Sequence, residues 1–193
     1  MAWLTESEVL DIGFKHIGND VLISNKASFY GAANISIGDR SRIDDFCVLS
    51  AGAGGIDIGC NVHVAVFCSL IGAERIQLAD FSGISSRVSI YSSSDDFSGA
   101  AMTNPTVPTE YTKVRSSPVL LGRHVVVGAG TIILPGSKVL EGASVGALSL
   151  VYGKCNAWGV YAGVPAKLIR PRLKGVLGLE EEYLKTIKGD GDS

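Results

Sequence analysis

An apolar residue recurs at every sixth position along most of this chain, and this spacing limits the possible folds more than any other feature. An α-helix would spread such residues over several faces, because six residues rotate it by about 600°. The period is instead typical of a parallel β-helix, in which three short strands form each turn, aliphatic residues point inward and small residues occupy the corners. Counted with short slips and one long interruption, the predicted inward series is Ile17, Ile23, Phe29, Ile37, Ile43, Leu49, Ile58, Val64, Leu70, Ile76, Ser82, Val88, Leu121, Val127, Ile133, Val139, Val145 and Val151.

Small or short side chains stand four positions after most of these residues. Three of the four cysteines, Cys47, Cys68 and Cys155, have this spacing. Cysteine at a small corner position acts as a compact apolar filler. We therefore predict that these three thiols pack inside the coil, while the role of Cys60 stays open.

The composition agrees with one such domain and excludes several classes of partner. The chain has 193 residues, 46% of them hydrophobic but only 7% aromatic, which suits a core of aliphatic side chains. A net charge of −2 provides no basic surface for nucleic acid. The N-terminal segment lacks the pattern of a signal peptide, and no uncharged run reaches the roughly 18 residues of a membrane span. We expect a cytoplasmic protein without nucleic-acid binding or membrane insertion.

The six-residue rhythm stops between Val88 and Leu121, where a polar segment with three prolines intervenes. We predict a β-helix domain over residues 1–172 that projects a long loop at about 92–118. A short N-terminal helix is expected over one open end of the coil, because unpaired ends invite aggregation. Residues 173–193 are predicted to form a C-terminal α-helix followed by a flexible tail.

The closing run "VYAGVPAKLIRPR" after "LVYGKCNAWG", together with the hexads, resembles the hexapeptide-repeat acyltransferases, in particular their galactoside and maltose acetyltransferase branch. The loop segment "IYSSSDDFSG…TNPTVP" is similar to a subset of that branch found in surface-polysaccharide synthesis. The resemblance implies a left-handed β-helix, a homotrimer with active sites in clefts between subunits, and acetyl-CoA as co-substrate along the C-terminal coils. It also implies that the loop helps to form the acceptor pocket, which gives the interruption of the repeat a function.

The resemblance also implies a histidine at the start of the loop that acts as general base, and this sequence departs from it. Asp95 or Asp96 stands at the matching place. In one hypothesis the base is His63, at a corner of the coil, working with these carboxylates to deprotonate a sugar hydroxyl. In the other the acceptor is an amine, which is partly neutral near pH 7 and needs no strong base. His124, which begins the coil after the loop, is a secondary candidate.

Small corners of the last coils and the motif that follows them are the candidate coenzyme A site. Small residues let the thin pantetheine arm lie against the coil, and basic residues can meet its phosphates. Lys167, Arg170 and Arg172 form the basic cluster near this end of the chain. The remaining candidate cofactor-binding residues are Gly128, Ala129, Gly146, Ala147, Ala162, Gly163, Pro165 and Ala166.

These features favour an acetyl-CoA-dependent O-acetyltransferase that acts on a sugar or sugar-nucleotide hydroxyl in O-antigen, capsule or related glycan synthesis. The alternative is a nucleotide-amino-sugar N-acetyltransferase, and a lesser one is a non-catalytic β-helix scaffold. A zinc-dependent carbonic anhydrase on the same fold would need three histidine ligands. Only His63 and His124 lie in the coil, so no metal is expected.

Overall fold

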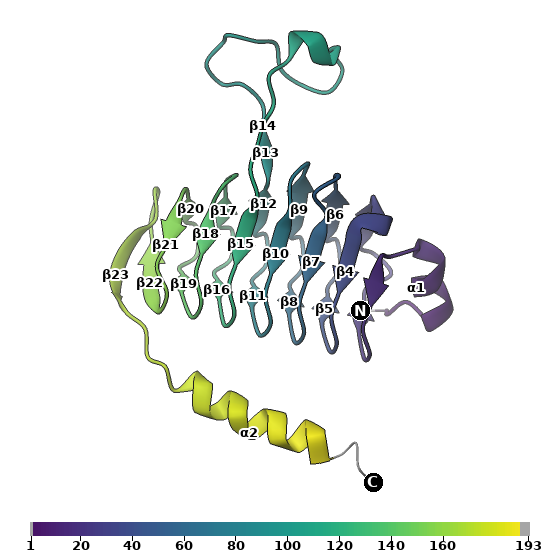
Figure 1. Ribbon diagram of the computed structural model, residues 1–193, viewed down its shortest axis with the longest axis vertical. Helices are drawn as coiled ribbons and strands as arrows, with labels where there is room; N and C mark the ends of the chain where they lie inside the picture. The colour runs from purple at the N-terminus through teal and green to yellow at the C-terminus, as the bar shows by residue number, and fades with distance from the viewer. Residues whose placement is uncertain (1, 190–193) are drawn as a thin grey trace.

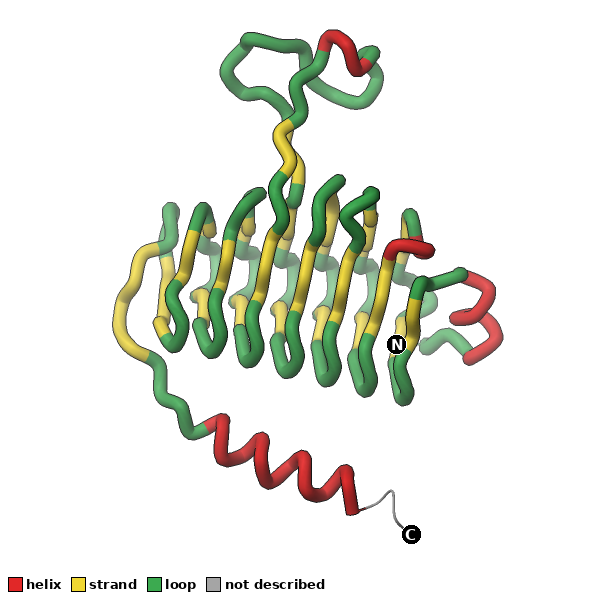
Figure 2. The backbone as a smooth tube through the Cα atoms, in the orientation of Figure 1, coloured by secondary structure: helices red, strands yellow, loops and turns green. Residues whose placement is uncertain are grey.

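The computed structural model describes residues 2–189 and has the predicted left-handed parallel β-helix at its centre. Short strands alternate with tight corners along the whole coil (Figure 2). Stacked strands of successive turns form three parallel sheets that surround one core. No helix among the described residues is long and apolar enough to span a lipid bilayer.

The strands of each sheet follow one another along the coil axis (Figure 1). The first sheet consists of β1 (His16–Ile17), β4 (Ile35–Ile37), β7 (Ile56–Ile58), β10 (Ile76–Leu78), β15 (Val119–Leu121), β18 (Lys138–Val139) and β21 (Lys154–Cys155). The second consists of β2 (Leu22–Ile23), β5 (Arg42–Ile43), β8 (His63–Val64), β11 (Gly83–Ile84), β16 (Val126–Val127), β19 (Ser144–Val145), β22 (Gly159–Ala162) and the antiparallel β23 (Lys167–Pro171). The third consists of β3 (Ser28–Tyr30), β6 (Val48–Ala51), β9 (Ser69–Gly72), β12 (Ser89–Tyr91), β17 (Ile132–Ile133) and β20 (Leu150–Val151).

The core is a stack of aliphatic side chains, to which each sheet contributes one or two residues per turn. Ile37, Ile43 and Leu49 fill one layer and are fully buried. Burying an Ile or Leu side chain contributes roughly 1.5–3 kcal/mol, so the repeated layers supply most of the driving force. The inward positions predicted from the period coincide with this core over most of the chain.

The predicted register was wrong by two residues in one turn. Leu78, Ile84 and Ile90 pair with Ile58, Val64 and Leu70, whereas the period had continued through Ile76, Ser82 and Val88. In the three-residue strand β10 both Ile76 and Leu78 point inward, because side chains alternate along a strand. Either residue therefore fits an apolar period, and the sequence could not choose between them.

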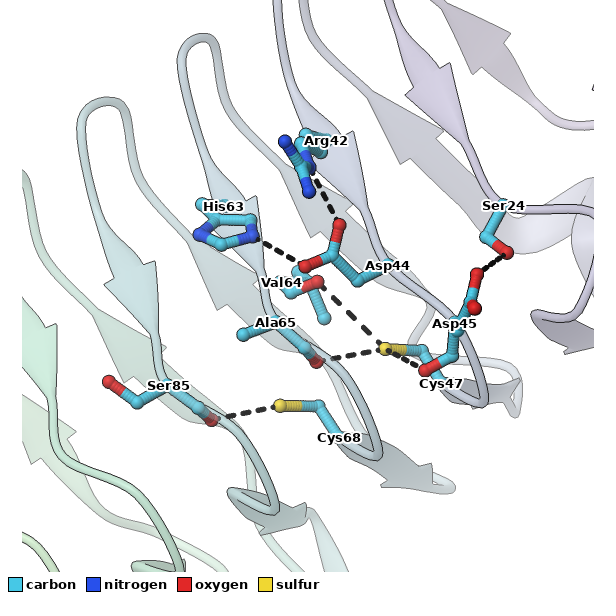
Figure 3. Close-up of polar contacts among 10 residues, drawn as sticks. All are labelled: Ser24, Arg42, Asp44, Asp45, Cys47, His63, Val64, Ala65, Cys68 and Ser85. Carbon is cyan, nitrogen blue, oxygen red and sulfur yellow. Dashed lines mark hydrogen bonds and ion pairs between the residues drawn. The ribbon is translucent and has the colours of Figure 1, made fainter. Parts of the chain in front are cut away.

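Two of the three assigned cysteines pack as predicted. Cys47 and Cys68 are buried, and their thiols lie 3.0 Å and 3.1 Å from the carbonyl oxygens of Ala65 and Ser85 (Figure 3). Cys155 is buried as predicted, but it lies in a strand and not at the predicted corner. It pairs with Val139 as an inward residue of β21, because the last turn of the coil is shorter than the preceding ones.

One helix lies at the N-terminal end of the coil, and a second runs alongside it. The first, α1 (Glu6–Ile12), begins with a capping box in which the Thr5 hydroxyl and the Glu8 carboxylate satisfy each other's backbone N–H groups. Val9 of this helix and the flanking Leu4 and Phe14 pack on the core at the N-terminal end. The C-terminal helix α2 (Val176–Gly189) runs back along one edge of the coil (Figure 1). The tail that we predicted to be flexible, residues 190–193, lies outside the described residues.

The loop leaves the coil after β12 and returns at β15. Its base is the antiparallel hairpin of β13 (Ser93–Ser94) and β14 (Arg115–Ser116). A short 3₁₀ helix, η2 (Thr109–Tyr111), lies near its far end, and a second one, η1 (Ala32–Asn34), precedes β4 in the coil. The hairpin holds the distal loop clear of the coil (Figure 1).

Candidate active site

His63 projects from the outer face of the second sheet, at the start of β8. Its Nε2 lies 2.9 Å from Oδ2 of Asp44, a residue that is only 4% exposed. Oδ1 of the same carboxylate accepts a hydrogen bond of 2.6 Å from Nε of Arg42 (Figure 3). Arg42 and His63 are register partners on neighbouring strands, so the coil itself places both side chains around one carboxylate.

A surface cavity of about 340 Å³ opens beside His63, lined also by Ala65, Gly83, Ile84, Ser85, Ser86 and Val126. Gly83 lies between His63 and Val126 in the ladder, and a Cβ there would meet no atom within 4 Å. The absence of a side chain at this rung therefore leaves the cavity open.

Sequence reasoning missed Asp44, Ser85 and Ser86. The serines looked like ordinary small corner residues, and the only signal for Asp44 was a carboxylate at a corner position.

The two aspartates of the loop have different surroundings. Asp96 is 5% exposed, and its carboxylate accepts hydrogen bonds from the Ser98 hydroxyl at 2.8 Å and from the N–H groups of Ala100 at 3.0 Å and Ala101 at 3.2 Å. The Ser98 hydroxyl is the main cause of a lowered pKa at Asp96. Asp96 is therefore occupied in ordering the loop.

Asp95 is the aspartate whose side chain remains available. Among residues 2–189 its carboxylate accepts no hydrogen bond. It lines a cavity of about 330 Å³ at the base of the loop. Arg115 and Tyr152 line the same cavity, so this pocket combines a carboxylate, a cation and an aromatic ring.

His63 and the loop aspartates do not meet within one chain. Their cavities share no lining residue. The hairpin rises from β12 on one side of the coil, while β8 lies toward the opposite edge (Figure 1). The expected pairing of His63 with Asp95 or Asp96 is thus replaced, inside the chain, by its contact with Asp44.

The structure places His124 apart from the His63 cavity and the loop cavity, in a separate cavity that it lines together with residues of α2. The residue is 3% exposed, its Nε2 lies 2.5 Å from Oε2 of Glu180, and its ring stacks on Phe81. Burial, aided by the nearby Arg123 cation, lowers the pKa of His124. Helix α2 covers this corner of the coil, so His124 serves to dock the helix.

The candidate coenzyme A residues gather along one edge of the last coils. A Cβ on Gly128 would lie 2.4 Å from the nitrogen of Ala147, and one on Gly146 would lie 3.0 Å from Cβ of Ala162. Ala129, Ala147 and Gly163 continue the same edge, since Leu148 N–H bonds to the Ala129 carbonyl and Leu150 N–H to that of Gly163. The small residues are therefore required by close stacking, and they themselves place nothing larger than a methyl group or the Pro165 ring at this edge.

The motif after β22 folds back onto this edge. A cis peptide bond joins Val164 to Pro165, and the Ala166 N–H bonds to the Leu150 carbonyl at 2.8 Å. Lys167 and Arg170 are exposed on β23. Arg172 is engaged elsewhere, because its Nη1 donates to the carbonyls of His124 and Gly142. Two cations thus remain beside the small-residue edge.

Within residues 2–189, no group of three or more His, Cys, Asp and Glu side chains is arranged to hold a metal ion. The polar side chains at the two cavities include His63 with its partner Asp44, Asp95, and the serines that line the His63 cavity.

No protein-family model matches the chain, but individual proteins do. A relative from Escherichia coli, dTDP-4-amino-4,6-dideoxy-D-glucose acyltransferase, is 51% identical over 190 residues, which is 98% of this chain and 99% of the relative. The chain belongs to this family of hexapeptide-repeat sugar acyltransferases. The family resemblance read from the last coil is thereby confirmed, and the scaffold interpretation is not supported.

Two further matches show the range of chemistry around this acyltransferase. AntD of Bacillus cereus, an N-acyltransferase crystallised with dTDP and 3-hydroxybutyryl-CoA, is 42% identical and superposes with a TM-score of 0.90 over 96% of this chain and 98% of AntD. WbbJ of Escherichia coli K12, named for O-acetyl transfer in lipopolysaccharide biosynthesis, is 31% identical over 77% of this chain and 74% of WbbJ.

Proposed function

We propose that this acyltransferase N-acylates a dTDP-linked 4-amino-4,6-dideoxy sugar, with an acyl-CoA as donor. The observation that carries the proposal is the 51% identity, over almost the whole chain, to an enzyme named for that acceptor. AntD structures hold dTDP, the amino sugar nucleotide and coenzyme A, which supports the same pair of substrates. We therefore favour the amine acceptor, our alternative interpretation, over the sugar hydroxyl that we first preferred.

The loop supports an amine acceptor on chemical grounds. A hydroxyl must lose its proton during attack, and a base at the loop would serve that purpose. Here Asp95 lies near the start of the loop, and the loop contains no histidine. An amine with a pKa near the α-amino value of about 8 is partly neutral at pH 7 and can attack the thioester directly.

The reaction forms one amide bond and breaks one thioester bond. The amine nitrogen attacks the acyl carbon, the carbon–sulfur bond breaks, and coenzyme A leaves. The proton released by the nitrogen finally resides on the coenzyme A thiol. Asp95 orients the amine by accepting one of its hydrogens, and holding both substrates together supplies much of the rate.

Coenzyme A is assigned to the small-residue edge of the last coils. The column of Gly128, Gly146 and Ala162 offers backbone beside which a pantetheine arm can lie. Lys167 and Arg170, both exposed, would meet the phosphates. For the transferred acyl group we propose only that its chain is short.

We assign the working form to a homotrimer with active sites between subunits. His63 and Asp95 line separate cavities of one chain, so a site containing both needs the loop of a neighbouring copy. A loop held clear of the coil by a hairpin has the reach that such an arrangement requires.

An O-acetyltransferase remains the second candidate because of the 31% identity to WbbJ. The deciding experiment measures thiol release from acetyl-CoA and from 3-hydroxybutyryl-CoA with two matched acceptors. One is dTDP-4-amino-4,6-dideoxyglucose, and the other is the same nucleotide sugar with a hydroxyl in place of the amine. Turnover with the amine alone supports the proposal. Turnover with the hydroxyl sugar alone would establish the second candidate instead.

A further inference from the structure

The carboxylate of Asp44 is buried yet bonded to two side chains that face outward. One oxygen accepts from Arg42 at 2.6 Å, and the other lies 2.9 Å from Nε2 of His63. Arg42 is itself held in place, since its guanidinium stacks over the Trp3 ring with 5.1 Å between guanidinium carbon and ring centroid. The chain of contacts runs Trp3, Arg42, Asp44, His63 and ends at the cavity that His63 lines.

This contact decides which nitrogen of His63 carries hydrogen. An ionised carboxylate only accepts hydrogen bonds, so the nitrogen facing it must be N–H. Nε2 is therefore the protonated nitrogen of the neutral ring. Nδ1 keeps the free lone pair, on the side of the ring turned away from Asp44 (Figure 3).

We propose that Asp44 is the positioning residue of the acyl-transfer reaction, holding His63 in the tautomer and orientation in which Nδ1 accepts the proton shed by the attacking amine. The inference rests on the proposed function for the identity of the acceptor. The proton moves from the amine nitrogen to Nδ1, the Nε2–H stays on Asp44, and the imidazolium later returns a proton to the departing thiolate. The carboxylate stabilises that transient cation while remaining ionised itself.

The neighbouring Asp45 differs from Asp44 in the side chains that it contacts. Asp45 bonds the Ser24 hydroxyl and Lys26, and neither of these lines the His63 cavity. Both residues are carboxylates at one corner of the coil, but only Asp44 contacts a side chain that lines this cavity. Asp45→Asn is therefore a matched control for Asp44→Asn.

Two measurements on the full-length enzyme test the proposal. The first is the ¹⁵N spectrum of the imidazoles, with His63 assigned by comparison with His63→Ala. We expect protonated Nε2 and bare Nδ1 in the unaltered protein, and loss of that preference in Asp44→Asn. The second is steady-state kinetics with acyl-CoA and dTDP-4-amino-4,6-dideoxyglucose. Asp44→Asn should lower kcat by about 10²–10⁴, the usual worth of a positioned base, with KM nearly unchanged. Asp45→Asn should change kcat by less than about threefold.

A double variant separates a role through His63 from any other role. In the His63→Ala background, Asp44→Asn should lower kcat by less than about twofold, because residues that act as a unit are not additive. A further tenfold loss, on the order of an independent contribution, would overturn the proposal. So would protonated Nδ1 in the unaltered enzyme. If the unaltered enzyme released no thiol with the amino sugar, the proposed function would fail, and the spectrum would still decide the role of Asp44.

Discussion

Asp95 and Asp96 are adjacent in sequence and differ in what their carboxylates contact. Both line the cavity at the base of the loop. Asp96 accepts three backbone N–H groups and the Ser98 hydroxyl, whereas the Asp95 carboxylate accepts no hydrogen bond within residues 2–189. The lowered pKa of Asp96 means that its contribution to loop stability is present above the ordinary value near 3.8. That contribution is lost as pH falls through the lower folded value. Near neutral pH, Asp96 should therefore hold the loop at full strength.

Exchanging each aspartate for asparagine should separate these two roles. Asp96→Asn weakens the acceptor for three amides, so faster amide hydrogen exchange is expected over residues 97–101. Asp95→Asn should leave exchange unchanged but lower kcat by roughly tenfold or more, since it alters a group proposed to touch the acceptor. Equal exchange rates in the two variants would contradict this assignment.

Helix α2 joins the corner of the coil through a partly buried polar cluster. Glu180 accepts from Arg123 and lies beside the buried His124, while Tyr183 donates to Asn61 at 2.9 Å. Phe81 packs against both His124 and Tyr183. A helix of this length is marginal alone in water, so its contacts with the coil are what keep it in place.

Glu180→Ala should release α2, because it leaves His124 buried without its partner. The expected loss is about 1–3 kcal/mol of unfolding free energy, seen as a lower urea midpoint and faster exchange in residues 176–187. Glu182→Ala is the control, since that residue is exposed on the same helix. Acyl-transfer activity of Glu180→Ala should fall little, because α2 does not line the His63 cavity. A loss of activity as large as that of His63→Ala would contradict this and place the helix in the active site.

At the scale of the whole molecule, the coil separates the two halves of the proposed site. His63 lies on the second sheet, and Asp95 belongs to a hairpin that leaves the third sheet. A rigid prism of stacked coils cannot bend to bring them together. In the trimer proposed above, two neighbouring copies bring them together, so we expect assembly to be a condition for activity rather than a means of stabilisation.

Mixed assemblies should reveal shared sites. His63→Ala and Asp95→Asn proteins, each poorly active alone, are denatured and refolded together or co-expressed with different tags. A trimer containing both types has interfaces that pair an intact His63 with an intact Asp95, so we expect activity to return to roughly a quarter of the unaltered level, as random pairing predicts. No recovery in verified mixed trimers would contradict the shared site. A monomeric active enzyme would do the same.

The six-residue period by itself determined the β-helix, the inward residues of most turns and the place of the loop, while the family came from the resemblance carried by the motif of the last coil. These follow from the sequence because stacked coils repeat one local environment, which the side chains must match. The partners of the site residues were decided only by the tertiary structure. Asp44 meets His63 from 19 positions away, and Glu180 meets His124 from 56 away. Coil length, corner geometry and the path of α2 set these two contacts. The contacts could not be predicted from the six-residue period, because they do not recur from turn to turn.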